Sequence, residues 1–204
     1  MGQHPDVANL DRRRLIAGLC AAGSLACLGC GRAALAGGAA EVATDGGPAA
    51  ASGMSYEEVF HYAYARSFIP TMKVVAGRVG LEVIQAAACE SAAREVASAA
   101  AGLPDRSLAA WAASLKEPTP ILEHALELDV VEESESVFEV RVTSCLWAST
   151  FRAADAADLG YAWVCHPDFD MARAFNPDMR LHRDRTLMQG ASHCNHRWQL
   201  ERDT

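Results

Sequence analysis

The sequence has few positive charges and does not gather them into a patch. Its 204 residues include 18 lysines and arginines against 26 aspartates and glutamates, which gives a formal net charge of −8. The only basic cluster is formed by residues 12–14. Nucleic acids and anionic membranes both require a basic surface for binding. The charge pattern therefore disfavours both as partners.

Long apolar runs are scarce as well. A membrane-spanning helix needs about 20 consecutive apolar residues, and only the uncharged run at residues 15–28 approaches this. The arginines at 12–14 precede that run, and the small triplet Ala-Leu-Ala at 34–36 follows it. A charged segment, an apolar segment and an A-x-A site form a secretory signal, and paired arginines are typical of the twin-arginine route. We expect residues 1–36 to be a cleaved twin-arginine signal peptide.

Export of this kind sets several further expectations. The twin-arginine translocase is a partner during export, and the mature chain is periplasmic or extracellular with no stable membrane span. A lipoprotein anchored at Cys27 or Cys30 is the less favoured alternative. The cysteines that remain after cleavage are Cys89, Cys145, Cys165 and Cys194.

Helical patterns fill the first part of the mature chain. Residues 37–54 are small and polar and predict a flexible linker. Ser55 and Glu58 have the spacing of a capping box, so a helix is expected to start there and to be interrupted at Pro70. A second helix is predicted over 80–101. A third is expected to be capped by Asp105 and to bury Leu108, Trp111 and Leu115.

Strand patterns dominate after residue 125. Residues 126–131 and 137–142 predict a hairpin, in which Phe138, Val140 and Val142 alternate with charged residues. Residues 145–159 are expected to be helical and 160–178 to be mixed. Two more strands are predicted over 179–188 and 192–200. The expected fold is α+β, a single domain over 55–204 in which N-terminal helices pack on a small antiparallel sheet formed mainly by the C-terminal half.

Residues able to carry chemistry gather in the C-terminal third. Cys145 follows a predicted strand, Cys165 lies close to His166 and Asp168, and Cys194 lies on the last strand. We place Cys194 and His196 on opposite faces of that strand. Cys89 lies on an alanine-rich helix and is expected to be an ordinary core residue.

Three interpretations of these cysteines remain open. A thiolate could act as a nucleophile beside a histidine and an aspartate. A divalent metal such as zinc could be bound and generate hydroxide, although the spacing matches no common metal motif. An exported chain could instead use two of the cysteines in a disulfide. The metal interpretation names Cys145, Cys165, His166 and Cys194 as ligands.

An ordered series of motifs in residues 141–198 resembles a known family. In sequence order the matching elements are Val142-Thr143-Ser144-Cys145, Leu159-Gly160, Cys165 with Asp168, Phe175-Asn176-Pro177, Arg183 with Thr186, and Gly190 with Cys194. Together they resemble the L-2-amino-thiazoline-4-carboxylic acid hydrolase family, and the likeness extends over about residues 56–198.

The resemblance implies a hydrolase that opens a C–N bond of a small cyclic amidine or amide, such as 2-aminothiazoline-4-carboxylate. It implies Cys165 or Cys194 as nucleophile or metal ligand, Cys145 as a third thiol of the site, and Asp168 as general acid or base or as partner to the substrate amidinium. The substrate-binding residues would be Arg183, Thr186 and Gly190, with Arg183 holding a carboxylate and Gly190 permitting a tight turn. The alternative function is a non-catalytic exported protein that binds a metal or small ligand in a thiol-rich pocket.

Overall fold

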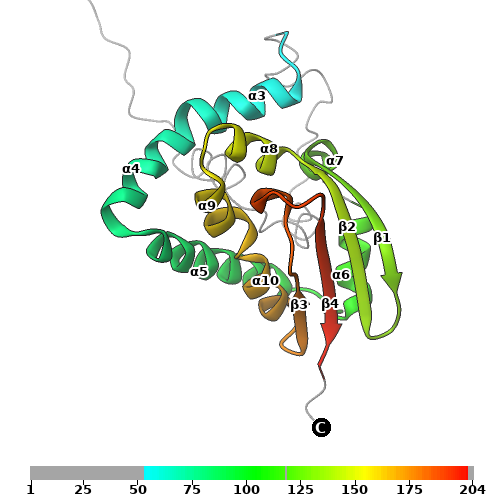
Figure 1. Ribbon diagram of the computed structural model, residues 1–204. Coiled ribbons are helices and arrows are strands. Elements are labelled where there is room, and N and C mark those ends of the chain that lie inside the picture. The colour runs from blue at the N-terminus through cyan, green and yellow to red at the C-terminus, as the bar shows by residue number, and fades with distance from the viewer. Residues whose placement is uncertain (1–52, 118, 202–204) are drawn as a thin grey trace, which may run out of the picture.

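The computed structural model describes residues 53–117 and 119–201 (Figure 1). The predicted signal peptide (1–36) and nearly all of the predicted linker (37–54) lie outside the described residues. Within the described part of the chain, no helix is both long and apolar enough to cross a membrane.

The described chain is α+β, as the sequence predicts. The helical elements are α3 (Tyr56–Ala63), the π-helical turn η2 (Tyr64–Phe68), α4 (Ile69–Val79), α5 (Leu81–Ala100), α6 (Leu108–Lys116), α7 (Pro120–Ala125), α8 (Leu146–Ala153), α9 (Ala157–Gly160), the π-helical turn η3 (Tyr161–Cys165), α10 (Asp168–Phe175) and the 3-10 turn η4 (Leu187–Gln189). The strands are β1 (Leu126–Glu133), β2 (Val137–Cys145), β3 (Met179–His182) and β4 (Cys194–Leu200).

The four strands form one antiparallel sheet in the order β1-β2-β4-β3 (Figure 1). Alternation along β2 buries Phe138, Val140 and Val142, as predicted. These side chains join one core cluster with residues of α5, α6 and α10. A second cluster joins α3, η2, α8 and α9. The two cores meet where β2 runs directly into α8, so this junction lies between the sheet and the helical half.

Local signals set the ends of the first helices. Ser55 caps α3 in a complete capping box with Glu58, which confirms the predicted start. The helix is interrupted before Pro70 by the turn η2 and resumes as α4, because proline has no amide hydrogen to donate to the preceding turn. Helix α5 buries its narrow stripe of small and branched side chains, Ile84, Ala88, Ala92, Val96 and Ala100.

Several predicted boundaries are wrong. The cap of α6 is Ser107, whose hydroxyl accepts from the amide of Ala110, whereas Asp105 accepts from the amide of Ser107. The segment 160–178 is mainly helical, as η3 and α10. The predicted strand over 179–188 ends at His182, because the chain then turns into η4. The predicted helix over 145–159 breaks near Asp155, which has a positive φ of 50°.

Candidate active site

Four separate parts of the chain place side chains at one end of the sheet. Strand β4 carries Cys194 and His196, which lie opposite Val142 and Val140 of β2. Cys145 ends β2. The turn between η3 and α10 carries Cys165 and Asp168, and Arg183 directly follows β3.

These residues enclose a cavity of about 50 Å³. It is lined by Leu115, Leu126, Leu128, Val140, Val142, Cys145, Val164, Cys165, Asp168, Arg183, Cys194, His196 and Trp198. The three cysteines that the sequence singles out therefore lie around one space. Placing Cys194 and His196 on opposite faces of β4 was wrong: residues two apart on a strand share a face, and both line the cavity.

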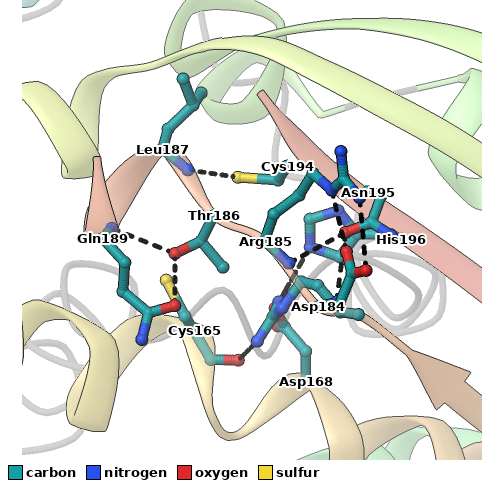
Figure 2. A network of polar contacts seen from close by, with 11 residues as sticks. Cys165, Asp168, Asp184, Arg185, Thr186, Leu187, Gln189, Cys194, Asn195 and His196 are labelled. Atoms are coloured by element: carbon teal, nitrogen blue, oxygen red, sulfur yellow. Dashed lines mark hydrogen bonds and ion pairs between the residues drawn. The ribbon is translucent and has the colours of Figure 1, made fainter. Parts of the chain in front are cut away.

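The polar centre of the cavity is a buried cluster of three residues. The Nη1 of Arg183 lies 2.7 Å from the Oδ2 of Asp168 and 2.9 Å from the Nε2 of His196. Its Nη2 donates to the carbonyl oxygen of Cys165 at 2.6 Å. The guanidinium also lies over the ring of Phe169, 5.0 Å from its centroid. Figure 2 draws this network with Cys165, Asp168 and His196 labelled.

Three atoms of this cluster are buried without a hydrogen-bond partner: the Oδ1 of Asp168, the Nε of Arg183 and the Nδ1 of His196. Burying an unsatisfied polar atom costs about 1–3 kcal/mol, so buried polar atoms normally have partners. Three such atoms on adjoining side chains are one acceptor and two potential donors. This arrangement fits a small polar ligand that both donates and accepts hydrogen bonds.

The contact with Arg183 determines which ring nitrogen of His196 carries the proton. A guanidinium nitrogen can only donate, so the Nε2 of His196 must accept. Burial lowers the pKa of His196, although the adjacent Asp168 opposes this shift, so the ring is neutral near pH 7. A neutral ring that accepts at Nε2 carries its proton at Nδ1, the unpartnered atom. His196 is therefore arranged as a hydrogen-bond donor to a ligand.

Arg183 remains charged in this environment. Burial would lower the pKa of Arg183, but the charge of Asp168 and its hydrogen bond to the guanidinium oppose burial, and the pKa is raised. Both terminal nitrogens are already engaged, by Asp168 and His196 at one and by the Cys165 carbonyl at the other. Three of the five N–H groups are thus engaged, and Nε is the nitrogen without any partner, so a substrate carboxylate would approach the guanidinium at Nε.

The three thiols are protonated at neutral pH. Burial raises the pKa of Cys145 to about 12 and that of Cys165 well above its ordinary range. Burial also raises the pKa of Cys194, where a backbone hydrogen bond and Arg183 oppose the shift. The Cys194 sulfur lies 3.1 Å from the amide nitrogen of Leu187 (Figure 2), whereas Cys145 caps α8 through the amide of Ala148. Cys194 is thus the thiol whose ionised form receives both a hydrogen bond and a nearby positive charge.

Thr186 and Gly190 build the turn that leads into β4. The Thr186 hydroxyl accepts from the amide of Gln189 and donates to its side-chain oxygen. Gly190 ends the 3-10 turn with a φ of 93°, a conformation that favours glycine. Neither residue lines the cavity. They form the turn that precedes Cys194.

The structure does not assemble the metal ligands that the sequence suggests. His166 does not line the cavity, and its Nδ1 lies 3.4 Å from the sulfur of Cys89. Among the described residues, no three donor atoms drawn from Cys145, Cys165, His166 and Cys194 lie within 4.8 Å of one another. The four described cysteines are free, so the disulfide interpretation has no counterpart in the structure.

The site residue absent from the sequence-based set is His196. The signal for it is the period of two along β4, because a residue two places after Cys194 must share its face. The sequence does not reveal that His196 is buried beside Asp168 and Arg183. That burial depends on α10 and on the segment after β3, which pack against His196 from distant parts of the chain.

Comparison with protein families matches residues 56–198 to the family described as L-2-amino-thiazoline-4-carboxylic acid hydrolase. Comparisons with curated proteins and with solved structures give no match. The matched range includes every residue that lines the cavity and covers more than half of the chain. The chain belongs to the L-2-amino-thiazoline-4-carboxylic acid hydrolase family.

Proposed function

We propose that this chain is a hydrolase that opens a small cyclic amidine such as 2-aminothiazoline-4-carboxylate in the cavity between β4 and α10. The observation that carries the proposal is the set of unpartnered buried atoms on Asp168, Arg183 and His196 beside three thiols. The family match supports hydrolysis as the class of reaction.

The small volume of the cavity favours a small substrate, and the unpartnered buried atoms in its mainly apolar lining favour a polar one. A volume of about 50 Å³ is far below the roughly 300–1,000 Å³ of pockets for drug-sized ligands. The free Oδ1 of Asp168 would accept from an amidinium N–H group. The Nδ1 of His196 and the Nε of Arg183 would donate to a substrate carboxylate or to the atom that leaves the ring.

We assign the nucleophile to Cys194. In the proposed step the basic amidine takes the thiol proton, and the thiolate adds to the ring carbon that is bonded to sulfur and two nitrogens. Collapse of the adduct breaks one ring bond and leaves the substrate carbon attached to Cys194. Water then adds to that carbon and the thiolate leaves, so one water is consumed and a carbamoyl product is released.

The bond that breaks decides the product. Opening at the ring C–N bond, which we propose, leaves a primary amine and a carbamoylated sulfur. Opening at the C–S bond would leave a free thiol and a carbamoylated nitrogen. The two products have the same mass and differ in their reaction with thiol and amine reagents.

The test is to incubate the purified chain with 2-aminothiazoline-4-carboxylate and to follow product mass, free thiol and free amine. We expect a product heavier by one water with a new amine. Cys194→Ser should lower kcat at least about 100-fold and still bind substrate. Cys145→Ser makes the same atomic change at a thiol that caps α8, and it should retain at least about a tenth of the activity.

Other outcomes would count against parts of the proposal. A product with a free thiol would replace C–N opening by C–S opening. Full activity in Cys194→Ser would remove the nucleophile assignment. Saturable binding without turnover, in the wild-type chain and with freshly reduced thiols, would favour the alternative of a non-catalytic binding protein.

We also propose that the chain works after twin-arginine export, in the periplasm or outside the cell. The support lies in the arrangement of residues 1–36, where basic, apolar and small residues follow one another. Replacing Arg12, Arg13 and Arg14 by lysine should leave the uncleaved chain in the cytoplasm. Export of that variant at the normal rate would exclude the twin-arginine translocase as its partner.

A further inference from the structure

A second cluster of reactive side chains lies outside the cavity, between α5 and the start of α10. Cys89 comes from α5, whereas His166 and Asp170 flank the turn that begins α10. The cysteine sulfur, a histidine nitrogen and a carboxylate oxygen of these residues all lie within 4.8 Å of one another. The sulfur is 3.4 Å from the Nδ1 of His166. Nothing in the proposed hydrolysis uses these three groups.

The spacing matches the geometry of a bound transition metal. Zinc lies about 2.0–2.3 Å from nitrogen, oxygen and sulfur ligands, so the ligand atoms of a tetrahedral site are about 3.3–3.8 Å apart. The observed separations reach that range with small side-chain movements. A set of one sulfur, one nitrogen and one oxygen suits zinc, whereas magnesium and calcium prefer oxygen alone.

The same contacts argue against a second catalytic triad. A nucleophilic cysteine needs a histidine as base and an aspartate that orients that histidine. Here the Cys89 thiol itself donates a hydrogen bond to the carboxylate of Asp170. The arrangement is convergent, with two groups directed at the sulfur, as in a ligand cluster.

We propose that Cys89, His166 and Asp170 bind one divalent metal ion of the zinc type, which fastens α5 to the turn before α10. Arg173 pairs with the Oδ1 of Asp170, but its side chain is half exposed and leaves the second oxygen to a metal. The fourth coordination position is filled by water, because the cluster is only partly buried.

The position of this metal links it to the active site. The fastened turn contains Cys165, whose carbonyl accepts from Arg183, and Asp168, which pairs with Arg183. Metal binding at the neighbouring His166 and Asp170 would therefore hold Cys165 and Asp168 in place at the cavity. This role is a positioning one, because the three ligands lie outside the cavity lining.

The experiment measures metal on the full-length chain, independently of activity. The purified chain is stripped with a chelator, loaded with zinc and passed through a desalting column, and metal per chain is counted. Cobalt is used in parallel, since a thiolate ligand gives it a charge-transfer band in the near ultraviolet. We expect about one zinc per chain, a cobalt–thiolate band, and a rise in Tm on loading.

Variants separate this site from the thiols of the cavity. Cys89→Ser and His166→Gln should each weaken zinc binding at least about tenfold and remove or alter the cobalt band. Cys89→Ala serves as a second variant if the serine disturbs folding, and circular dichroism verifies each variant. Cys145→Ser, a matched change in the cavity, should keep both the metal and the band.

Three results would overturn the proposal. They are an absence of stoichiometric zinc, retention of zinc at full affinity in Cys89→Ser, and loss of zinc in Cys145→Ser with retention in Cys89→Ser. The last would place the metal among the cavity thiols. A chain that binds zinc through Cys89 but opens no amidine would leave this proposal standing and remove the proposed function.

Discussion

Asp168 and Arg183 form an ion pair inside the domain, with 2.7 Å between Oδ2 and Nη1 and side chains that are 8% and 1% exposed. The carboxylate belongs to the first turn of α10, and the guanidinium follows β3. The pair therefore joins two walls of the cavity. Removing one partner of a buried ion pair leaves a charge that neither water nor protein compensates.

We predict that Asp168→Asn lowers the free energy of unfolding by about 3 kcal/mol, since Arg183 would lose its counter-charge. Urea unfolding measures this change. The matched control is Asp184→Asn, whose partner Arg185 is exposed, and which should change stability little. If both substitutions lower the free energy of unfolding equally, the buried Asp168–Arg183 pair matters no more for stability than the exposed Asp184–Arg185 pair.

Stability should fall on acidification because of His196. Burial lowers the pKa of His196 in the folded chain, whereas in the unfolded chain it titrates near its ordinary value of about 6.5. Below that value the unfolded state binds more protons than the folded state. The free energy of unfolding is therefore highest above about pH 6.5 and decreases as the pH falls below it, by at most about 1.4 kcal/mol per pH unit.

The measurement is urea unfolding at several values between pH 7.5 and about pH 5. His196→Gln removes the titrating ring, so its stability should vary less with pH than that of the wild-type chain. His182→Gln is the control, because it makes the same change at an exposed histidine. A parallel decline in wild-type and His196→Gln chains would contradict the assignment.

Stability should also fall at alkaline pH because of Cys145. Burial raises the pKa of its thiol to about 12 from about 9, so the folded state retains a proton that the unfolded state loses above pH 9. The contribution of this thiol to the free energy of unfolding is fully present below pH 9 and is lost as the pH rises towards 12. Between pH 8 and 10 we expect a loss of about 1 kcal/mol.

Cys145→Ser isolates this contribution, because serine does not titrate in the range. Its stability under reducing conditions should fall less than that of the wild-type chain between pH 8 and 10. The comparison is made as a difference between the two chains, so the other alkaline groups cancel. An identical decline in both would mean that the Cys145 thiol ionises as readily in the folded chain as in the unfolded chain.

The sequence predicts the elements that depend on local signals. The capping box at Ser55 and Glu58, the helix over 80–101 and the alternation in β2 each arise from neighbouring residues, and each prediction is confirmed. The segment 160–178 is different. Its two helical pieces are short and follow one another around Pro167, and they are held against α5 by tertiary packing. Composition alone reveals neither piece.

The sequence predicts which residues form the candidate site better than it predicts how these residues are arranged. The sequence nominates Cys145, Cys165, Asp168, Arg183 and Cys194, and all five line one cavity. His166 follows Cys165 in the sequence, which suggested that both belong to one site. The helical turn after Cys165 directs consecutive side chains to different sides, so this suggestion is wrong. His166 thus meets Cys89, 77 positions away. That contact depends on how α5 lies against α10, which no local pattern encodes.

The turn at Gly190 offers a test of backbone strain without steric conflict. Gly190 has a φ of 93°, and a β-carbon placed there would meet nothing within 4 Å. Gly190→Ala should therefore destabilise the fold only through its backbone conformation, by about 1–2 kcal/mol. Because this turn leads into β4, the same variant should also weaken the contact between the Leu187 amide and the Cys194 sulfur.

Gly77→Ala is the matched control, since Gly77 lies in the exposed interior of α4 and a β-carbon there also meets nothing within 4 Å. Alanine should stabilise that helix by about 0.5–1 kcal/mol. Thermal or urea unfolding of both variants gives opposite signs if the conformation at residue 190 is the cause. A gain in stability at both sites would mean that Gly190 can leave the left-handed region without loss, so that Thr186 and the hydrogen bonds of η4 suffice to form the turn.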